Sequence, residues 1–175
     1  MTDGICRNHI IFIGFMGSGK STIARKLARY ENMTSVDMDA SIAREAGMSI
    51  PEIFEAEGES GFRAREHALL ESMLYREPCI ISCGGGVVVS AENRRLITSL
   101  GTVVYLEVTA EESRARISRP QSRPLLNGSV SPAELLEQRR ALYEEIADIR
   151  FSTSGLAIGQ VVSQLAIILK ERGIL

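Results

Sequence analysis

Residues 10–22 read IIFIGFMGSGKST, an apolar run that leads into a glycine-rich turn and then into Lys-Ser-Thr. The stretch fits the phosphate-binding pattern G-x-x-x-x-G-K-[ST], with Gly14, Gly19, Lys20 and Ser21 at its fixed positions. Glycines allow backbone N–H groups to close around a polyphosphate, and the positive end of the following helix faces it. The stretch therefore predicts a strand, a phosphate-binding loop and a helix, in that order.

The polar residues of this loop have expected parts in binding a nucleoside triphosphate. Lys20 reaches the outer phosphates, and the hydroxyl of Ser21 coordinates Mg²⁺. The predicted ATP contacts in the loop are Gly14, Gly17, Ser18, Gly19, Lys20, Ser21 and Thr22. An ordinary glycine-rich turn is the alternative, but apolar residues with helical spacing in residues 23–28 favour the phosphate site.

Length and charge narrow the class of protein. The 175 residues suffice for one domain with its own core, and no linker marks a second domain. The 20 basic and 22 acidic residues give a net charge of −2, which argues against nucleic acid or an anionic membrane as a main partner. We therefore expect a single domain over residues 1–175 that acts on small molecules as a monomer.

The cysteines indicate a reducing compartment. Cys6, Cys79 and Cys83 are odd in number and lack the C-x-x-C spacing, so neither a disulfide framework nor a zinc site is indicated. The longest apolar runs are much shorter than a membrane span, and we expect no targeting segment. The sequence thus predicts a cytoplasmic protein without a membrane partner.

Strand and helix patterns alternate along the chain. Strands are expected at 10–13, 34–37, 78–83, 102–106 and 149–152. Helical patterns separate them, with capping boxes at 49–52, 109–112 and 131–134 and helix-ending glycines at 58 and 101. This alternation predicts an α/β fold, a three-layer α/β/α sandwich around a five-stranded parallel sheet.

Two aspartates follow the second strand. Residues two apart on an extended segment face the same way, so Asp37 and Asp39 are both expected to project from the carboxyl edge of the sheet, where ligands bind in open α/β folds. The alternative is that Asp39 only caps a helix that starts near Ser41. A cap would leave Asp37 without a role, which favours the first interpretation.

The helix expected over residues 60–75 carries two charges on its apolar side. Its stripe consists of Phe62, Leu69, Leu70, Met73 and Leu74. Glu66 falls at the centre of that stripe, and Arg63 lies inside its edge. Either the pair is a buried structural salt bridge, or Glu66 holds the guanidinium of Arg63 for a bound anion.

The third strand ends at Gly84-Gly85-Gly86, where many P-loop proteins place a magnesium-binding aspartate. Backbone without side chains permits close approach of a ligand, and its N–H groups can donate to that ligand. A merely flexible turn is the alternative, although two glycines would suffice for it.

Two arginine-bearing segments follow. Residues 118–129 hold two prolines, a glycine and two arginines without periodicity, which indicates a lid-type loop. The helix after Ser131 has an apolar stripe with Arg139 near its centre and Arg140 at its margin. The stripe consists of Leu135, Leu136, Leu142, Tyr143 and Ile146. Because an unpaired buried guanidinium is costly, we expect Arg139 to face a carboxylate from the protein or from a ligand.

Together these motifs resemble those of the shikimate kinases in order and approximate spacing, from Ile11 to about Phe151. They are the phosphate loop, Asp37-x-Asp39, Phe62-Arg63-x-x-Glu66, Gly84-Gly85-Gly86, Arg123-Pro124-Leu125-Leu126 and Arg139. The resemblance implies transfer of the ATP γ-phosphoryl group to the 3-hydroxyl of shikimate, in aromatic amino-acid biosynthesis. It also implies a P-loop fold like that of nucleoside monophosphate kinases.

The resemblance further implies a role for each motif. Lys20 and the loop backbone would hold the phosphates, and Arg123 would close over the transferring phosphoryl group. Ser21 would organise Mg²⁺ together with Asp37, which would act through water. Asp39 would receive the substrate hydroxyls and act as base. The catalytic residues would be Lys20, Asp39 and Arg123, and Arg116 and Arg123 would join the ATP contacts. The substrate contacts, largely from a helical segment at about residues 39–75, would be Asp39, Arg63, Glu66, Gly84, Gly85, Gly86 and Arg139.

The sequence departs from the family pattern in two places. Ala141 stands where the family commonly has a proline, and the register to Tyr143 selects Arg139 over Arg140. The loop after Phe151 lacks an arginine-proline pair, so no adenine contact is assigned there. The enzymatic alternative is another small polyol or sugar-acid kinase, such as a gluconate kinase. The non-enzymatic alternative is a nucleotide-dependent switch or a silent binding module.

Overall fold

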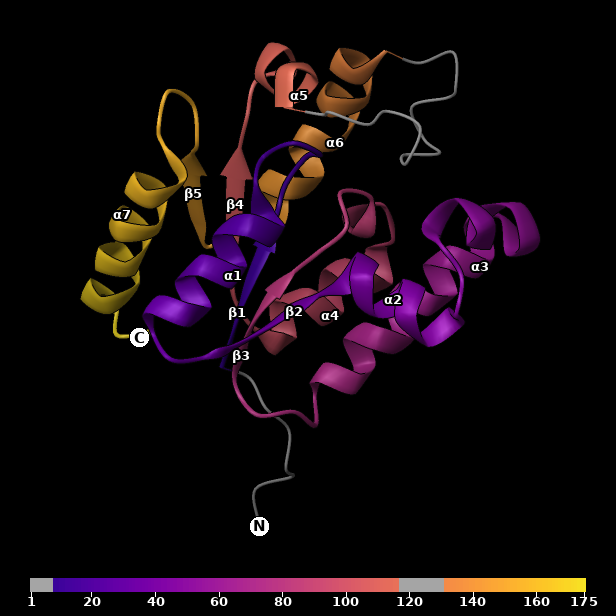
Figure 1. The fold of residues 1–175 in the computed structure, drawn as a ribbon, viewed down its shortest axis with the longest axis horizontal. Coiled ribbons are helices and arrows are strands. Elements are labelled where there is room, and N and C mark those ends of the chain that lie inside the picture. Colours follow the sequence, from indigo (N-terminus) through magenta and orange to yellow (C-terminus); the bar gives the residue numbers. More distant parts are fainter. Residues whose placement is uncertain (1–7, 117–130) are drawn as a thin grey trace.

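Five parallel strands form one sheet in the order β2-β3-β1-β4-β5 in the computed structural model, which describes residues 8–116 and 131–175 (Figure 1). The strands are β1 (His9–Ile13), β2 (Thr34–Asp37), β3 (Cys79–Ser82), β4 (Gly101–Glu107) and β5 (Ile149–Ser152). The central strand β1 pairs with β3 and β4, so that Ile11 lies between Ile81 and Val103. The predicted five-stranded parallel sheet is confirmed.

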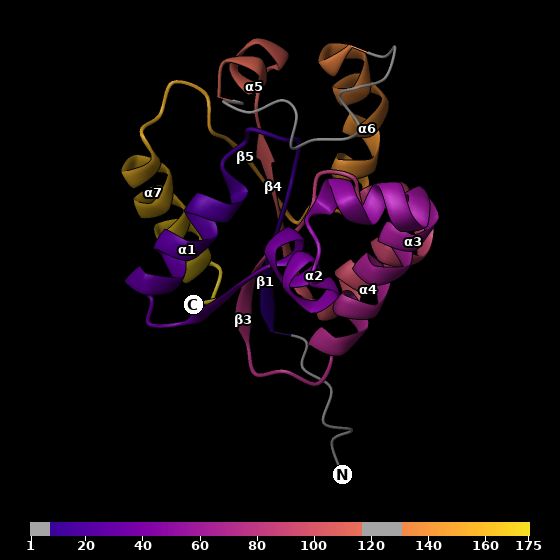
Figure 2. The ribbon, with the colours of Figure 1, turned by 45° about the vertical axis from the view of Figure 1, so that its right-hand side comes forward.

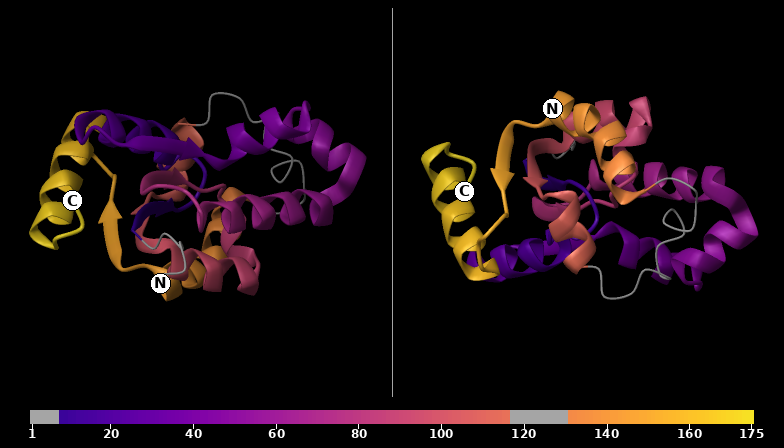
Figure 3. Two further views of the ribbon diagram at one scale, coloured as in Figure 1. Left: turned by 90° about the horizontal axis from the view of Figure 1, so that it is seen from below. Right: turned by 90° about the horizontal axis from the view of Figure 1, so that it is seen from above.

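Helices cover both faces of this sheet (Figures 1 and 3). One face carries α1 (Lys20–Tyr30) and α7 (Ile158–Glu171), and the other carries α3 (Ile50–Met73), α4 (Ala91–Leu100) and α6 (Pro132–Ile146). The remaining elements are α2 (Met38–Ala46), which packs on α3, α5 (Ala110–Arg116) and a short 3₁₀ helix η1 (Val87–Val89). None of the described helices combines the length and apolarity needed to cross a membrane.

Residues 10–13 of the central strand are all apolar, and their packing explains why. Ile10 and Phe12 pack into the core beneath α1 and α7, whereas Ile11 and Ile13 pack into the core beneath α3, α4 and α6. All four side chains are fully buried. A parallel strand with helices on both faces buries successive residues on opposite sides, so the whole run is apolar.

Helix starts follow the sequence signals closely. The side chains of Ser49 and Ser131 accept hydrogen bonds from the backbone N–H groups of Glu52 and Glu134. In turn, the side chain of each glutamate accepts a hydrogen bond from the backbone N–H of the cap residue. At Gly58 the backbone has φ 70° and ψ −177°, which interrupts the helical conformation inside α3. The short helix and the long helix predicted on either side of Gly58 are therefore the two halves of α3, joined at a bend.

The prediction for the segment after β2 was wrong in one respect. Helix α2 begins at Met38, and the Oδ1 atom of Asp37 accepts a hydrogen bond of 3.0 Å from the backbone N–H of Ala40. Asp37 is thus the cap residue, and Asp39 lies in the first turn of α2 rather than on an extended segment. The alternative of a helix start near Ser41 was wrong as well, because the carboxylate of Asp37 stabilises the helix from its first turn.

Candidate active site

The phosphate-binding loop joins β1 to α1 at the carboxyl edge of the sheet (Figure 2). Gly14 has φ 144°, and a Cβ atom at this position would lie 2.5 Å from the carbonyl oxygen of Leu106 in β4. Only glycine allows the loop to run this close to the neighbouring strand. Gly19, in the left-handed conformation, leads directly into α1. The predicted strand, loop and helix are all present.

The ammonium group of Lys20 lies over this loop. Its Nζ donates hydrogen bonds to the carbonyl oxygens of Gly14 (2.8 Å) and Phe15 (2.9 Å) and contacts the Ser18 hydroxyl at 3.4 Å. The residue is 8% exposed. Phosphate oxygens are stronger partners for an ammonium than these neutral groups, so the loop suits a polyphosphate.

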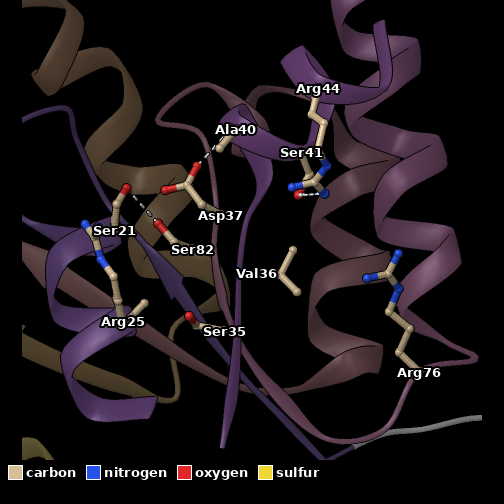
Figure 4. A pocket seen from close by; sticks show the side chains of 11 residues that line it. Ser21, Arg25, Ser35, Val36, Asp37, Ala40, Ser41, Arg44, Arg76 and Ser82 are labelled. Carbon is tan, nitrogen blue, oxygen red and sulfur yellow. Dashed lines mark hydrogen bonds between the residues drawn. The ribbon is translucent and has the colours of Figure 1, made fainter. Parts of the chain in front are cut away.

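Hydroxyl and carboxylate oxygens meet at one end of a groove of about 500 Å³ beside β2 (Figure 4). The Ser21 hydroxyl lies 3.3 Å from the Ser82 hydroxyl, and one oxygen of Asp37 points toward both, while the other bonds to Ala40. Mg²⁺ prefers such hard oxygen ligands, so these residues fit the ion. Within the described residues no group of three or more His, Cys, Asp or Glu is placed to hold a metal ion, so phosphate and water would complete its coordination.

Three arginines also line this groove. Arg25 of α1, Arg44 of α2 and Arg76 after α3 line it together with the hydroxyls of Ser35 and Ser41 (Figure 4). Arg44 donates to Ser41 at 3.4 Å. Cationic side chains thus lie along the groove, with Arg25 near Ser21 and with Arg44 and Arg76 farther from it (Figure 4).

Arg63 and Glu66 form a close ion pair, as the helical pattern predicted. Nη1 of Arg63 lies 2.5 Å from Oε2 of Glu66, and Nη2 contacts Glu59 at 3.0 Å. Glu66 is 0% exposed. Burial raises the pKa of its carboxyl group, and the attraction of Arg63 acts against that rise. Oε1 of Glu66 and Nε of Arg63 are buried, and neither finds a hydrogen-bond partner among the described residues.

Three side chains surround the glycines that follow β3. A Cβ atom on Gly84 would lie 2.8 Å from Oδ1 of Asp39 and 3.0 Å from Oε1 of Glu66, and one on Gly86 would lie 2.7 Å from Nη1 of Arg63. The glycines therefore make room for these charged groups. Asp39, Arg63 and Glu66, expected to bind substrate, are brought together here.

Arg139 reaches the same glycines from α6. The residue is 6% exposed, and Nη1 donates a 3.2 Å hydrogen bond to the carbonyl oxygen of Gly85. No carboxylate in residues 8–116 or 131–175 lies within ion-pair distance of it. Of the two partners predicted for Arg139, a carboxylate of the protein is thus not found in the described part, and a ligand carboxylate remains the prediction.

Arg116 connects the phosphate loop with the segment after β5. Its guanidinium donates to the hydroxyl (3.1 Å) and the carbonyl oxygen (3.3 Å) of Thr153, and it contacts the Gly17 carbonyl at 3.4 Å. Arg123 and the predicted lid at 118–129 lie outside the described residues. The contacts of Ser82, Tyr143 and Thr153 were not foreseen from the sequence, because they depend on segments far apart in the chain.

The chain is similar to known proteins of one family. The family model described as shikimate kinase matches residues 16–170. A shikimate kinase of Vibrio parahaemolyticus is 42% identical over 170 residues, which cover 95% of this chain and 98% of that protein. A solved structure of a shikimate kinase from Acinetobacter baumannii, in complex with shikimate, is 34% identical with a TM-score of 0.88 and covers 94% of both chains. The shikimate kinase of Aquifex aeolicus, also 34% identical, superimposes with a TM-score of 0.82 over 94% of this chain and 98% of that one.

Proposed function

The chain belongs to the shikimate kinase family, whose members are ATP-dependent phosphotransferases with an alcohol acceptor, and we propose that its site transfers the γ-phosphoryl group of ATP to the 3-hydroxyl of shikimate. The products are shikimate 3-phosphate and ADP, in the pathway to chorismate and the aromatic amino acids. One observation carries the proposal: two inward arginines, Arg63 and Arg139, meet at the glycines next to a phosphate-binding loop. They supply the charge needed to hold a small carboxylate beside a nucleotide.

The nucleotide side of the site is assigned to the loop and its neighbours. Lys20 and the loop backbone would hold the phosphates, and Ser21, together with Asp37 through water, would hold Mg²⁺, with Ser82 beside them. Bound Mg²⁺ would neutralise charge on the phosphate oxygens. Arg116 lies where a nucleotide bound to the loop would extend toward Thr153.

The substrate side is assigned to residues around Gly84–Gly86. Arg63 and Arg139 bind the carboxylate of shikimate, and Glu66 keeps the guanidinium of Arg63 in place through its 2.5 Å contact. Asp39 accepts the hydroxyl groups and removes the proton from the attacking oxygen. Phosphoryl transfer requires mainly positioning and charge neutralisation, which these groups supply.

The test is an ADP-release assay with shikimate, gluconate and a panel of other hydroxy acids. We expect turnover with shikimate far above that with any other acceptor, and turnover with gluconate alone would favour the sugar-acid alternative. Tight ATP binding without phosphoryl transfer to any acceptor would favour the non-enzymatic alternative, a silent binding module. Arg123→Ala is expected to lower kcat by about a hundredfold, as for other arginines that contact the transferring phosphoryl group, with little change in shikimate affinity.

Location and assembly are further predictions from the sequence. We propose a cytoplasmic location, because three cysteines without C-x-x-C spacing suit a reducing compartment. We propose that the enzyme acts as a monomer, and light scattering at working concentration tests this.

A further inference from the structure

The carbonyl oxygen of Gly85 receives two hydrogen bonds from the same face of α6. The hydroxyl of Tyr143 donates to it at 2.5 Å, and Nη1 of Arg139 donates at 3.2 Å. Residues four apart in a helix lie on one face, so both donors approach from one side. A carbonyl oxygen has two lone pairs and can accept both bonds at once.

The two donors differ in how firmly they are held. Tyr143 is fully buried, and its ring stacks on that of Tyr105 with the ring centroids 5.0 Å apart. Burial raises the pKa of the Tyr143 hydroxyl well above its ordinary value, so the group stays protonated and remains a donor. Arg139 has several further N–H groups on a long side chain and can turn toward another acceptor.

The peptide that carries this carbonyl also carries the N–H group of Gly86. In a planar trans peptide the C=O and N–H groups point in opposite directions. A carbonyl held toward α6 therefore aims the Gly86 N–H away from α6. Among residues 8–116 and 131–175 no hydrogen bond from this N–H is found.

We propose that Tyr143 is a positioning residue for substrate binding. When shikimate enters, Arg139 moves its N–H group from the Gly85 carbonyl to the substrate carboxylate, and Tyr143 keeps that carbonyl hydrogen-bonded. Without the tyrosine hydroxyl, the guanidinium of Arg139 would be held at the carbonyl, because an unpaired buried carbonyl is costly, and it would be less free to turn toward the substrate. The inference rests on the proposed function, since it assigns Arg139 to the substrate carboxylate.

The test compares Tyr143→Phe with Tyr105→Phe, which removes the other hydroxyl of the same stacked pair. Calorimetry with shikimate and with ATP, and steady-state kinetics, are run on both variants and on the wild type. We expect Tyr143→Phe to raise the Kd and the KM for shikimate about tenfold, the cost of one unsatisfied buried group, with kcat and ATP affinity nearly unchanged. ATP binding also reports that the variant is folded. Tyr105→Phe should leave shikimate binding as in the wild type.

A double-mutant cycle separates positioning from general stability. If Arg139 stays on the carbonyl in the Tyr143→Phe variant, it contributes less to substrate binding in that variant. Arg139→Leu should then cost less shikimate affinity in the Tyr143→Phe background than in the wild type. Additive losses, or unchanged shikimate affinity in Tyr143→Phe, would overturn the inference while leaving the proposed function intact. Failure of the wild type itself to bind or turn over shikimate would overturn the proposed function, and the inference with it.

Discussion

The guanidinium of Arg63 fills the space that a side chain on residue 86 would need. A Cβ atom on Gly86 would lie 2.7 Å from Nη1 and 2.9 Å from Cζ of Arg63, and Gly86 has a negative φ of −99° that any residue adopts. The glycine is therefore required for space and not for backbone conformation. Two residues far apart in sequence share one small volume at the substrate site.

Gly86→Ala is accordingly expected to displace Arg63 and weaken shikimate binding by about tenfold or more, since overpacking costs about 1–3 kcal/mol. ATP affinity should change little, because the clash lies on the substrate side. Calorimetric titration with each ligand measures both. Gly85→Ala should be much milder, because its Cβ would have its nearest contacts at 3.5 Å. Equal losses in the two variants would refute the steric explanation.

Arg139→Leu is expected to cost about 2–5 kcal/mol of shikimate binding, because it removes one of the two charges that we propose bind the substrate carboxylate. Its neighbour Arg140 is exposed and paired with Glu137 at 3.2 Å, so Arg140→Leu is the matched control and should bind shikimate normally. Calorimetry and thermal melting are measured on both. A folded Arg139→Leu variant with wild-type shikimate affinity would show that the arginine is structural.

Asp37 has two separable roles, a helix cap and a proposed magnesium ligand. Asparagine caps helices about as well as aspartate, so Asp37→Asn should keep the melting temperature while raising the Mg²⁺ concentration needed for half-maximal activity about tenfold. Asp37→Ala should show the same Mg²⁺ effect and also lose about 1 kcal/mol of stability. An unchanged Mg²⁺ requirement in both variants would remove Asp37 from the metal site.

Cys83 lies next to the substrate glycines, yet its thiol should be inert. The residue is 2% exposed, and burial together with the nearby Glu66 raises its pKa well above the ordinary range. Alkylation by iodoacetamide requires an accessible thiolate, so labelling in the folded protein should be about a hundredfold slower than in denaturant. Mass spectrometry of the peptide that contains Cys83 gives both rates. Rapid labelling without denaturant would mean that this part of the core opens readily.

The sequence predicted the sheet and most helix boundaries because these depend on local signals. The apolar runs, the serine caps of Ser49 and Ser131 and the glycine after α4 act over a few residues, and the structure follows them. The inward position of Glu66 also followed from helical periodicity alone, and the residue is fully buried. Periodicity thus locates a charge in the interior without any knowledge of the partner.

Contacts between segments far apart in the chain could not be predicted from these local signals. Asp37 and Asp39 are both good cap residues, and only the hydrogen bond to Ala40 identifies which one starts α2. Tyr143 was placed on the apolar stripe as a core residue, but its hydroxyl contacts Gly85, 58 residues earlier in the chain. A tyrosine in a stripe of aliphatic side chains is the signal that was available, because a buried hydroxyl needs a partner.

Gly58 imposes a limit on how this sequence can vary. A Cβ atom there would meet nothing within 4 Å, so an inspection of contacts would class the position as open to any residue. Its combination of φ 70° and ψ −177° is nevertheless nearly exclusive to glycine. Any other amino acid would favour a straight α3 and so change how α3 packs against α2, the helix that carries Asp39. In a saturation library, this solvent-facing residue should therefore tolerate change as poorly as one that touches the substrate, and the defect should appear in phosphoryl transfer.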